Sequence, residues 1–190
     1  TDTIDTKNGL IVLNGDTIRD GNWINGGYQV INLKEGYIYN SDISTATTVL
    51  KAFHCDKDYY DQLKRMSIVS TNRIQNSLPK YAIGYGNFSP MQIITYYNAI
   101  ANDGIMVKPI FTKQNSIIIN QKIASNKNIA IIKELLFLNV KKGMGLKAHS
   151  DIVDIAGKGG AIRLNKKITN MDTFCIQFYA TLPAKHPEYS

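Results

Sequence analysis

The chain has 190 residues, of which 44% are hydrophobic and 19% are charged, which is enough to bury the core of one domain. It contains no run of eighteen apolar residues, so composition excludes a typical membrane-spanning helix. The net charge is +7, but the basic residues are scattered apart from pairs such as Lys141-Lys142 and Lys166-Lys167. No zinc-finger or helix-turn-helix spacing accompanies them, which argues against nucleic-acid binding.

The cysteines and histidines are spaced in ways that argue against a metal or cofactor site. Cys55 and Cys175 lie far apart and form no C-x-x-C pair, so we expect free thiols. The three histidines lack the spacing of metal ligands. Gly157 to Gly160 could suggest a phosphate-binding loop, but the strand–loop–helix order of such loops is missing. The sequence therefore indicates no metal and no cofactor.

The first third of the chain predicts a hairpin and two helices. Leu10 to Leu13 is a short apolar run between the turn dipeptides Asn8-Gly9 and Asn14-Gly15, which is typical of a β-hairpin. A glycine-containing loop follows. A short helix is then expected from Leu33 to Tyr39 and a second from Ile43 to Phe53.

The middle of the chain contains the clearest helix signals. Asp56 is expected to cap a helix that runs through Met66. Ser89 is a good N-cap, Pro90 suits the first helical position, and Gly104 is a natural stop.

The last third predicts one long helix and a strand pair. The helix should begin after Ser125 and end at Gly143. Strands are expected from Ile152 to Leu164 and from Met171 to Leu182, joined by a polar turn at residues 165–167. This order predicts one α+β domain over residues 1–190, with helices packed on one face of an antiparallel sheet.

An ordered series of short motifs runs along nearly the whole chain. The series comprises Thr17-Ile18-Arg19-Asp20, Gly26-Gly27-Tyr28, Ile83-Gly84-Tyr85-Gly86, Ser89-Pro90-Met91-Gln92, residues 97–104 (YNAIANDG), Val107-Lys108-Pro109, Gly143-Met144-Gly145, residues 155–161 (IAGKGGA) and residues 179–190. Residues 83–104 are the most specific part. The series resembles the transpeptidase domain of class B penicillin-binding proteins, the cell-division type in particular.

This resemblance implies a fold similar to the penicillin-recognising serine transpeptidases, with an incomplete sheet. Members acylate a serine with a peptide that ends in D-Ala-D-Ala, or with a β-lactam, by means of the motifs S-x-x-K, S-x-N and K-T-G. It further implies a role in peptidoglycan synthesis and cell division at the extracytoplasmic face of the bacterial inner membrane. The expected partners are peptidoglycan stem peptides or β-lactams and division proteins. We expect the anchor to lie outside the chain.

The first motif is expected upstream of residue 1, which is Thr rather than Met. Within the chain, Ser77-Leu78-Pro79-Lys80 matches S-x-x-K, but about one such match is expected by chance. Pro79 is also expected to break the helix on which the serine and lysine must share a face. We therefore do not take Ser77 as a nucleophile.

The second motif is expected at residues 39–43. Aligned on the following helix, Asn40 takes the place of the serine and Asp42 that of the asparagine. Asn40 has no hydroxyl group to relay a proton, and Asp42 adds negative charge. A one-residue shift would place Ser41 in the serine position. Alternatively, these three residues simply cap the next helix.

The third motif is expected at Lys158. Lys158 and Gly160 match K-T-G, whereas Gly159 replaces the threonine and Ala161 replaces a frequent hydroxyl residue. Loss of a buried donor to a charged group costs about 1.5–3 kcal/mol, so we expect weak substrate binding at best; Lys158 could also be an ordinary strand lysine. Departures at both motifs favour a non-catalytic domain. The alternative is part of an active D,D-transpeptidase whose nucleophile lies upstream.

Overall fold

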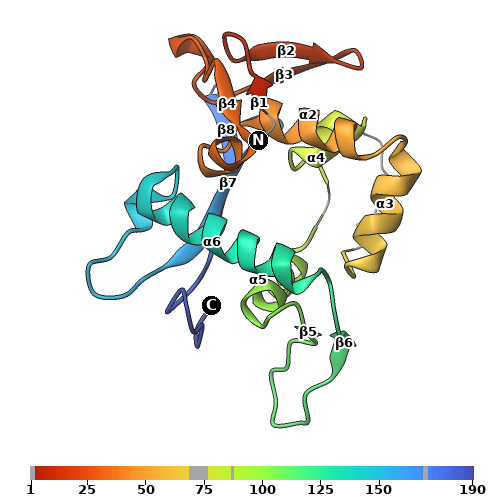
Figure 1. Cartoon of the computed structure of the whole chain (residues 1–190), viewed down its shortest axis with the longest axis vertical. Helices are drawn as coiled ribbons and strands as arrows, with labels where there is room; N and C mark the ends of the chain where they lie inside the picture. The colour runs from red at the N-terminus through yellow and green to blue at the C-terminus, as the bar shows by residue number, and fades with distance from the viewer. Residues whose placement is uncertain (1–2, 69–76, 87, 169–170) are drawn as a thin grey trace.

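Short strands and helices alternate along the chain, and one long strand pair closes it (Figure 1). The computed structural model describes residues 3–68, 77–86, 88–168 and 171–190. The strands are β1 (Thr3–Asp5), β2 (Leu10–Leu13), β3 (Asp16–Arg19), β4 (Val30–Asn32), β5 (Met106–Val107), β6 (Ile118–Asn120), β7 (Ala156–Ile168) and β8 (Met171–Thr181). The helices are α1 (Leu33–Ile38), α2 (Asp42–Ala52), α3 (Asp56–Arg65), α4 (Leu78–Ala82), α5 (Pro90–Ala101) and α6 (Asn126–Lys142), with 3-10 turns η1 (Trp23–Asn25) and η2 (Leu146–Ala148).

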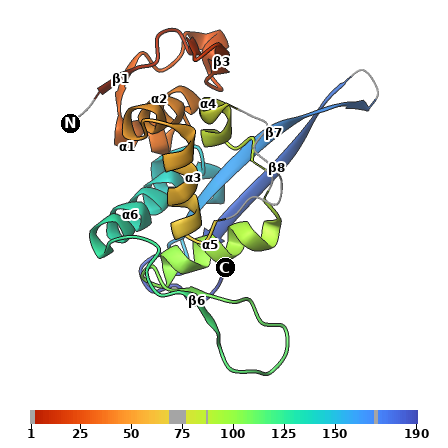
Figure 2. The same cartoon turned by 90° about the vertical axis from the view of Figure 1, so that its right-hand side faces the viewer.

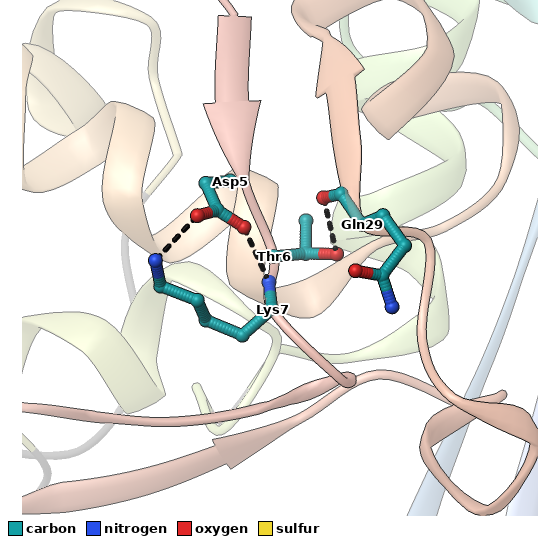
Figure 3. Close-up of polar contacts among 4 residues, drawn as sticks. All are labelled: Asp5, Thr6, Lys7 and Gln29. Atoms are coloured by element: carbon teal, nitrogen blue, oxygen red, sulfur yellow. Dashed lines mark hydrogen bonds and ion pairs between the residues drawn. The ribbon is translucent and has the colours of Figure 1, made fainter.

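The strands pair antiparallel, two by two, among the described residues: β1 with β4, β2 with β3, β5 with β6, and β7 with β8. The predicted hairpin at Leu10 is confirmed as β2–β3. The end of β1 is tied to the segment before β4 because the backbone N–H and Oγ1 of Thr6 both donate to the carbonyl of Gln29, at 2.7 and 3.0 Å (Figure 3). Beside it, the Asp5 carboxylate accepts from both the backbone and the ammonium of Lys7.

Helices α1 and α2 meet at a close junction that later forms part of the site. Asn32 and Glu35 form a reciprocal capping box at the start of α1. Ser41 caps α2 by accepting from the backbone N–H of Ser44 at 3.0 Å. A β-carbon on Gly36 would lie 2.1 Å from Ser44 Oγ, so only glycine permits this approach of α1 to α2.

Helices α5 and α6 enclose the main core. Both start as predicted: Ser89 forms a capping box with Gln92 at α5, and Ser125 accepts from the Asn128 N–H at α6. The core between them and β7 contains a set of nearly fully buried residues: Ala99, Ile100, Met106, Ile123, Ile129, Leu136 and Ala156. No helix in the described part of the chain is both long and apolar enough to cross a bilayer.

Three predicted details of the helices and strands are corrected. Cys55 rather than Asp56 occupies the N-cap position of α3. The strand expected from Ile152 begins instead at Ala156, and residues 165–167, expected as a turn, continue β7 to Ile168. Ile152 is 98% exposed; strand propensity without a paired neighbour or a buried face does not make a strand. The expected end of the second strand at Leu182 agrees with β8 to within one residue.

The short helix α4 was not predicted. Pro79 lies in its first turn and Ser77 in its N-cap position. Because the first-turn N–H groups have no partner within the helix, proline is tolerated there. The expectation that Pro79 breaks a helix was therefore wrong at this position.

Helices cover the β7–β8 ribbon as expected for an α+β fold. Helix α6 packs against β7 and α5 against β8 (Figure 2). The β2–β3 hairpin and the loop between β5 and β6 lie at opposite ends of the molecule in both views (Figures 1 and 2).

Candidate ligand-binding site at Lys158

Lys158 lies near the start of β7, opposite Tyr179 of β8, and faces the junction of α1 and α2. Its ammonium contacts Oδ1 of Asn40 and lies 5.0 Å from the ring centroid of Tyr37. The Asn40 Nδ2 donates to the carbonyl of Gly159 at 3.2 Å. One amide side chain therefore bridges the lysine and the backbone of the next strand residue.

The position of Asn40 depends on a left-handed backbone. Its φ is 55°, a conformation that asparagine tolerates better than most residues. The N–H of Ser41 then donates to the carbonyl of Gly36 at 2.9 Å, which ends α1. The last residue of α1 is held from α6, because Asn139 donates through Nδ2 to the carbonyl of Ile38 at 2.8 Å. The core helix α6 thus holds the end of α1 against β7.

Burial pushes the two ionisable groups of the site towards their neutral forms. It lowers the pKa of Lys158 to about 8, although the nearby Asp42 carboxylate opposes the shift. Burial also raises the pKa of Asp42 to about 7, assisted by the charge of Asp20 and opposed by Lys158. Both groups therefore titrate near neutral pH, which is frequent at functional sites.

Ser41 points away from Lys158 into a separate buried cluster. Its hydroxyl lies 3.0 Å from each oxygen of Asp20 and donates to that carboxylate. Asp20 also accepts the backbone N–H of Ile43 at 3.0 Å. Ser41 and Asp20 are 0% and 1% exposed. The capping interpretation therefore holds for Ser41, and its hydroxyl does not reach the site.

The strand after Lys158 is open. Gly160 and Ala161 are exposed, and a β-carbon built on Gly159 would meet Phe178 at 3.5 Å and the carbonyl oxygen of Gln177 at 3.7 Å, both ordinary van der Waals contacts. By contrast, a β-carbon on Gly157 would lie 2.7 Å from the carbonyl oxygen of Tyr179. Position 159 thus has room for a larger side chain, whereas position 157 does not.

The S-x-x-K match at Ser77 belongs to another part of the molecule. The hydroxyl of Ser77 contacts one oxygen of Asp16, and Lys80 Nζ lies 2.5 Å from the other. Asp16 belongs to β3, against which α4 packs. The contacts described for this serine and lysine join two elements and do not involve Lys158.

Sequence reasoning named Asn40, Asp42 and Lys158 but missed Tyr37 as a member of the site. Tyr37 provides the aromatic face beneath the ammonium, and burial raises its pKa well above the usual range, so it stays neutral. Asp20 belongs to the first motif of the series, which assigns it no role. Within the described residues, no group of three or more His, Cys, Asp or Glu side chains is placed to hold a metal ion.

Comparison with known proteins gives a consistent result. The family model of the penicillin binding protein transpeptidase domain matches residues 29–190. No curated protein of similar sequence was found. The transpeptidase domain of penicillin-binding protein 3 from Burkholderia pseudomallei aligns with a TM-score of 0.77 at 16% identity, over 98% of this chain and 61% of that one.

Two further solved structures show the same fold. PBPA from Mycobacterium tuberculosis gives a TM-score of 0.80 at 16% identity, over 98% of this chain and 48% of that one. The D,D-transpeptidase domain of a peptidoglycan glycosyltransferase from Eggerthella lenta gives 0.73 at 16% identity, over 97% and 52%. The chain thus spans less than two thirds of each of these proteins. Since the family model covers most of its residues, the chain belongs to the penicillin-binding protein transpeptidase domain family.

Proposed function

We propose that this domain serves peptidoglycan synthesis by binding the carboxylate end of a stem peptide at Lys158 without acylating it. The supporting observation is the contact between the Lys158 ammonium and the Asn40 amide. A cation is present for a carboxylate, but the adjacent group is an amide, which does not accept and pass on a proton near neutral pH. The hydroxyl of Ser41, the residue next to Asn40 in sequence, is committed to Asp20.

One observation favours the second candidate, part of an active D,D-transpeptidase whose nucleophile lies upstream of residue 1. The pKa of Lys158 is lowered to about 8, and a group that titrates near the working pH is suited to proton transfer. Under this alternative Lys158 would itself relay the proton that Asn40 does not.

Covalent labelling separates the two candidates. The chain, and any longer gene product that contains it, should be incubated with labelled penicillin and analysed by mass spectrometry. We expect no increase in mass in either protein. A shift by one drug mass in the longer product would favour the active transpeptidase and overturn the non-catalytic assignment.

Binding at Lys158 is tested by titrating a D-Ala-D-Ala peptide and following the chemical shifts by NMR. We expect weak binding that falls further at high salt, because screening reduces the attraction between ammonium and carboxylate. Lys158→Ala should abolish it, whereas Lys147→Ala, at an exposed lysine of η2, should not. Binding that is indifferent to salt and to Lys158→Ala would contradict the proposal.

Gly159→Thr provides a gain-of-binding test. Because a β-carbon fits at position 159, threonine should add a hydroxyl donor next to Lys158. A hydrogen bond to a charged group contributes about 1.5–3 kcal/mol, so we expect roughly ten- to a hundredfold tighter peptide binding. Gly159→Val, which has the shape of threonine without the hydroxyl, is the matched control and should not tighten binding. An unchanged affinity in Gly159→Thr would show that the carboxylate does not bind beside this strand.

We also propose that the domain acts at the extracytoplasmic face of the inner membrane together with division proteins, on the basis of the cell-division-type motifs. A fluorescent fusion of the longer gene product should then concentrate at the division site. A uniform distribution along the cell would contradict the link to division and leave the binding proposal to its own tests.

A further inference from the structure

The loop between β5 and β6, residues 108–117, projects from one end of the molecule (Figures 1 and 2). Its base is held firmly: Met106 lies in the main core, and Asn120 donates through Nδ2 to the carbonyl of Arg65 at 2.8 Å. The N–H of Ile123 donates to the carbonyl of Gly104 at 3.0 Å. A well-anchored base therefore presents a protruding loop.

The loop is exposed, and apolar side chains flank its polar turn at residues 112–116. Every residue from Ile110 to Ile119 is exposed, and Phe111 is 83% exposed. The exposed apolar side chains of the loop and β6, which we call the apolar flanks, are Ile110, Phe111, Ile117, Ile118 and Ile119. Single apolar residues scattered on a surface are ordinary, but several exposed apolar side chains on one projecting segment favour an interaction site.

Positive charge accompanies the apolar flanks, with two lysines in the loop and two in the segment that follows β6. Lys108, Lys113, Lys122 and Lys127 are all exposed, and the sequence has no Asp or Glu from residue 104 to 133. None of these four lysines forms an ion pair with another residue of the described chain. The surface therefore complements a partner that is negative outside and apolar beneath.

We propose that the β5–β6 loop docks onto an anionic lipid surface. Ile110 and Phe111 enter the boundary between headgroups and acyl chains, while the lysines contact lipid phosphates. An acidic protein would match the charge as well, but a stable protein interface needs about 800 Å² on each side. A narrow projecting loop offers little surface area for such an interface, whereas insertion into the membrane interface needs only a few apolar side chains.

The test is co-sedimentation of the full chain with vesicles of phosphatidylcholine alone or mixed with phosphatidylglycerol, at low and high salt. We expect binding to the anionic vesicles that weakens at high salt. The double variant Ile110→Ser/Phe111→Ser should lower the partition coefficient by about tenfold or more. Lys108→Glu/Lys113→Glu should lower it by at least about fivefold per lysine.

Matched controls distinguish a specific surface from the general positive charge of the chain. Val12→Ser/Ile152→Ser removes two exposed apolar side chains elsewhere, and Lys147→Glu/Lys185→Glu reverses two exposed lysines elsewhere. Equal losses in controls and loop variants would overturn the proposal, as would absence of vesicle binding. A concentration-dependent dimer, or binding to an acidic protein, that is lost in the loop variants without vesicle binding would assign the surface to a protein partner instead. All outcomes are independent of Lys158.

Discussion

Asn40 and Ser41 are neighbours in sequence, yet their side chains belong to two different polar clusters. The Ser41–Asp20 cluster is closed: the buried carboxylate accepts from a hydroxyl and from backbone N–H groups of α2. The cluster of Asn40, Asp42 and Lys158 is open: its two ionisable groups are pushed towards neutrality by burial. Burial raises the pKa of Asp20 as well, but there hydrogen bonds from the protein oppose the shift, whereas the shift of Asp42 is opposed by the charge of Lys158. Buried ionisable groups with perturbed pKa values are frequent at functional sites.

The largest expected effect comes from breaking the closed cluster. Asp20→Ala leaves the Ser41 hydroxyl and the N–H of Ile43 without their acceptor in the protein interior. Each buried unsatisfied group costs about 1–3 kcal/mol, so we expect a loss of about 3–5 kcal/mol in the free energy of unfolding. Denaturation in urea measures it.

Asp5→Ala is the matched control for that experiment. Asp5 is an acid at the end of a strand too, but its ion pair with Lys7 is exposed, and exposed pairs contribute little to stability because water and salt screen them. A loss in Asp20→Ala no larger than in Asp5→Ala would show that the closed cluster contributes no more than a surface pair.

In the open cluster, substitution of Asp42 should raise the stability of the fold rather than lower it. Its raised pKa of about 7 means that the folded state disfavours the carboxylate. At low pH the carboxyl is neutral in both states and costs the folded state nothing. As the pH rises above the unfolded pKa, the unfolded chain ionises more readily than the folded one, so the folded state loses stability until the pH has passed about 7. Asp42→Asn removes the charge, so at about pH 8.5 we expect a Tm higher by a few degrees, at roughly 2–4 °C per kcal/mol. The gain should disappear below about pH 3, where the carboxyl of the unmodified chain is protonated in both states.

Thermal unfolding followed by circular dichroism across this pH range measures the effect. Asp151→Asn is the control, because its side chain is fully exposed and no comparable pH-dependent gain is expected. A lower Tm for Asp42→Asn at alkaline pH would mean that the attraction to Lys158 outweighs the cost of burying the carboxylate.

Elements with strong end signals could be predicted from the sequence, and those that depend on distant partners could not. Ser89-Pro90 and Ser125 placed the starts of α5 and α6 correctly, because N-caps are local. The short strands β1 and β5 were missed, since three or two residues gain stability only from their partner strands. The start of β7 was placed at Ile152 because apolar composition alone does not say where pairing begins.

The site was predicted in part. The resemblance to the second and third transpeptidase motifs placed Asn40 and Lys158 as candidates, and the structure brings them into contact across 118 positions of sequence. The side chain of Ser41 faces Asp20, whereas that of Asn40 faces Lys158. This divergence depends on the left-handed backbone of Asn40, which hydrophobic periodicity does not indicate. Tyr37 was missed because an aromatic residue in a short helix is equally consistent with ordinary core packing.

The smallest expected effect separates the backbone of Asn40 from its side chain. Asn40→Gly keeps access to the φ of 55° but removes the amide, whereas Asn40→Ala removes the amide and also disfavours that backbone. The left-handed conformation costs an ordinary residue about 1–2 kcal/mol, so Asn40→Ala should be less stable than Asn40→Gly by about 1 kcal/mol in urea denaturation. Both variants remove the carbonyl oxygen that faces the Lys158 ammonium. A charged form that loses a hydrogen-bond partner is disfavoured, so the pKa of Lys158, followed by heteronuclear NMR, should fall below about 8 in both. Equal stabilities of the two variants, with a lowered pKa of Lys158, would mean that Asn40 acts through its amide and not through its backbone. An unchanged pKa of Lys158 would mean that the amide does not stabilise the ammonium.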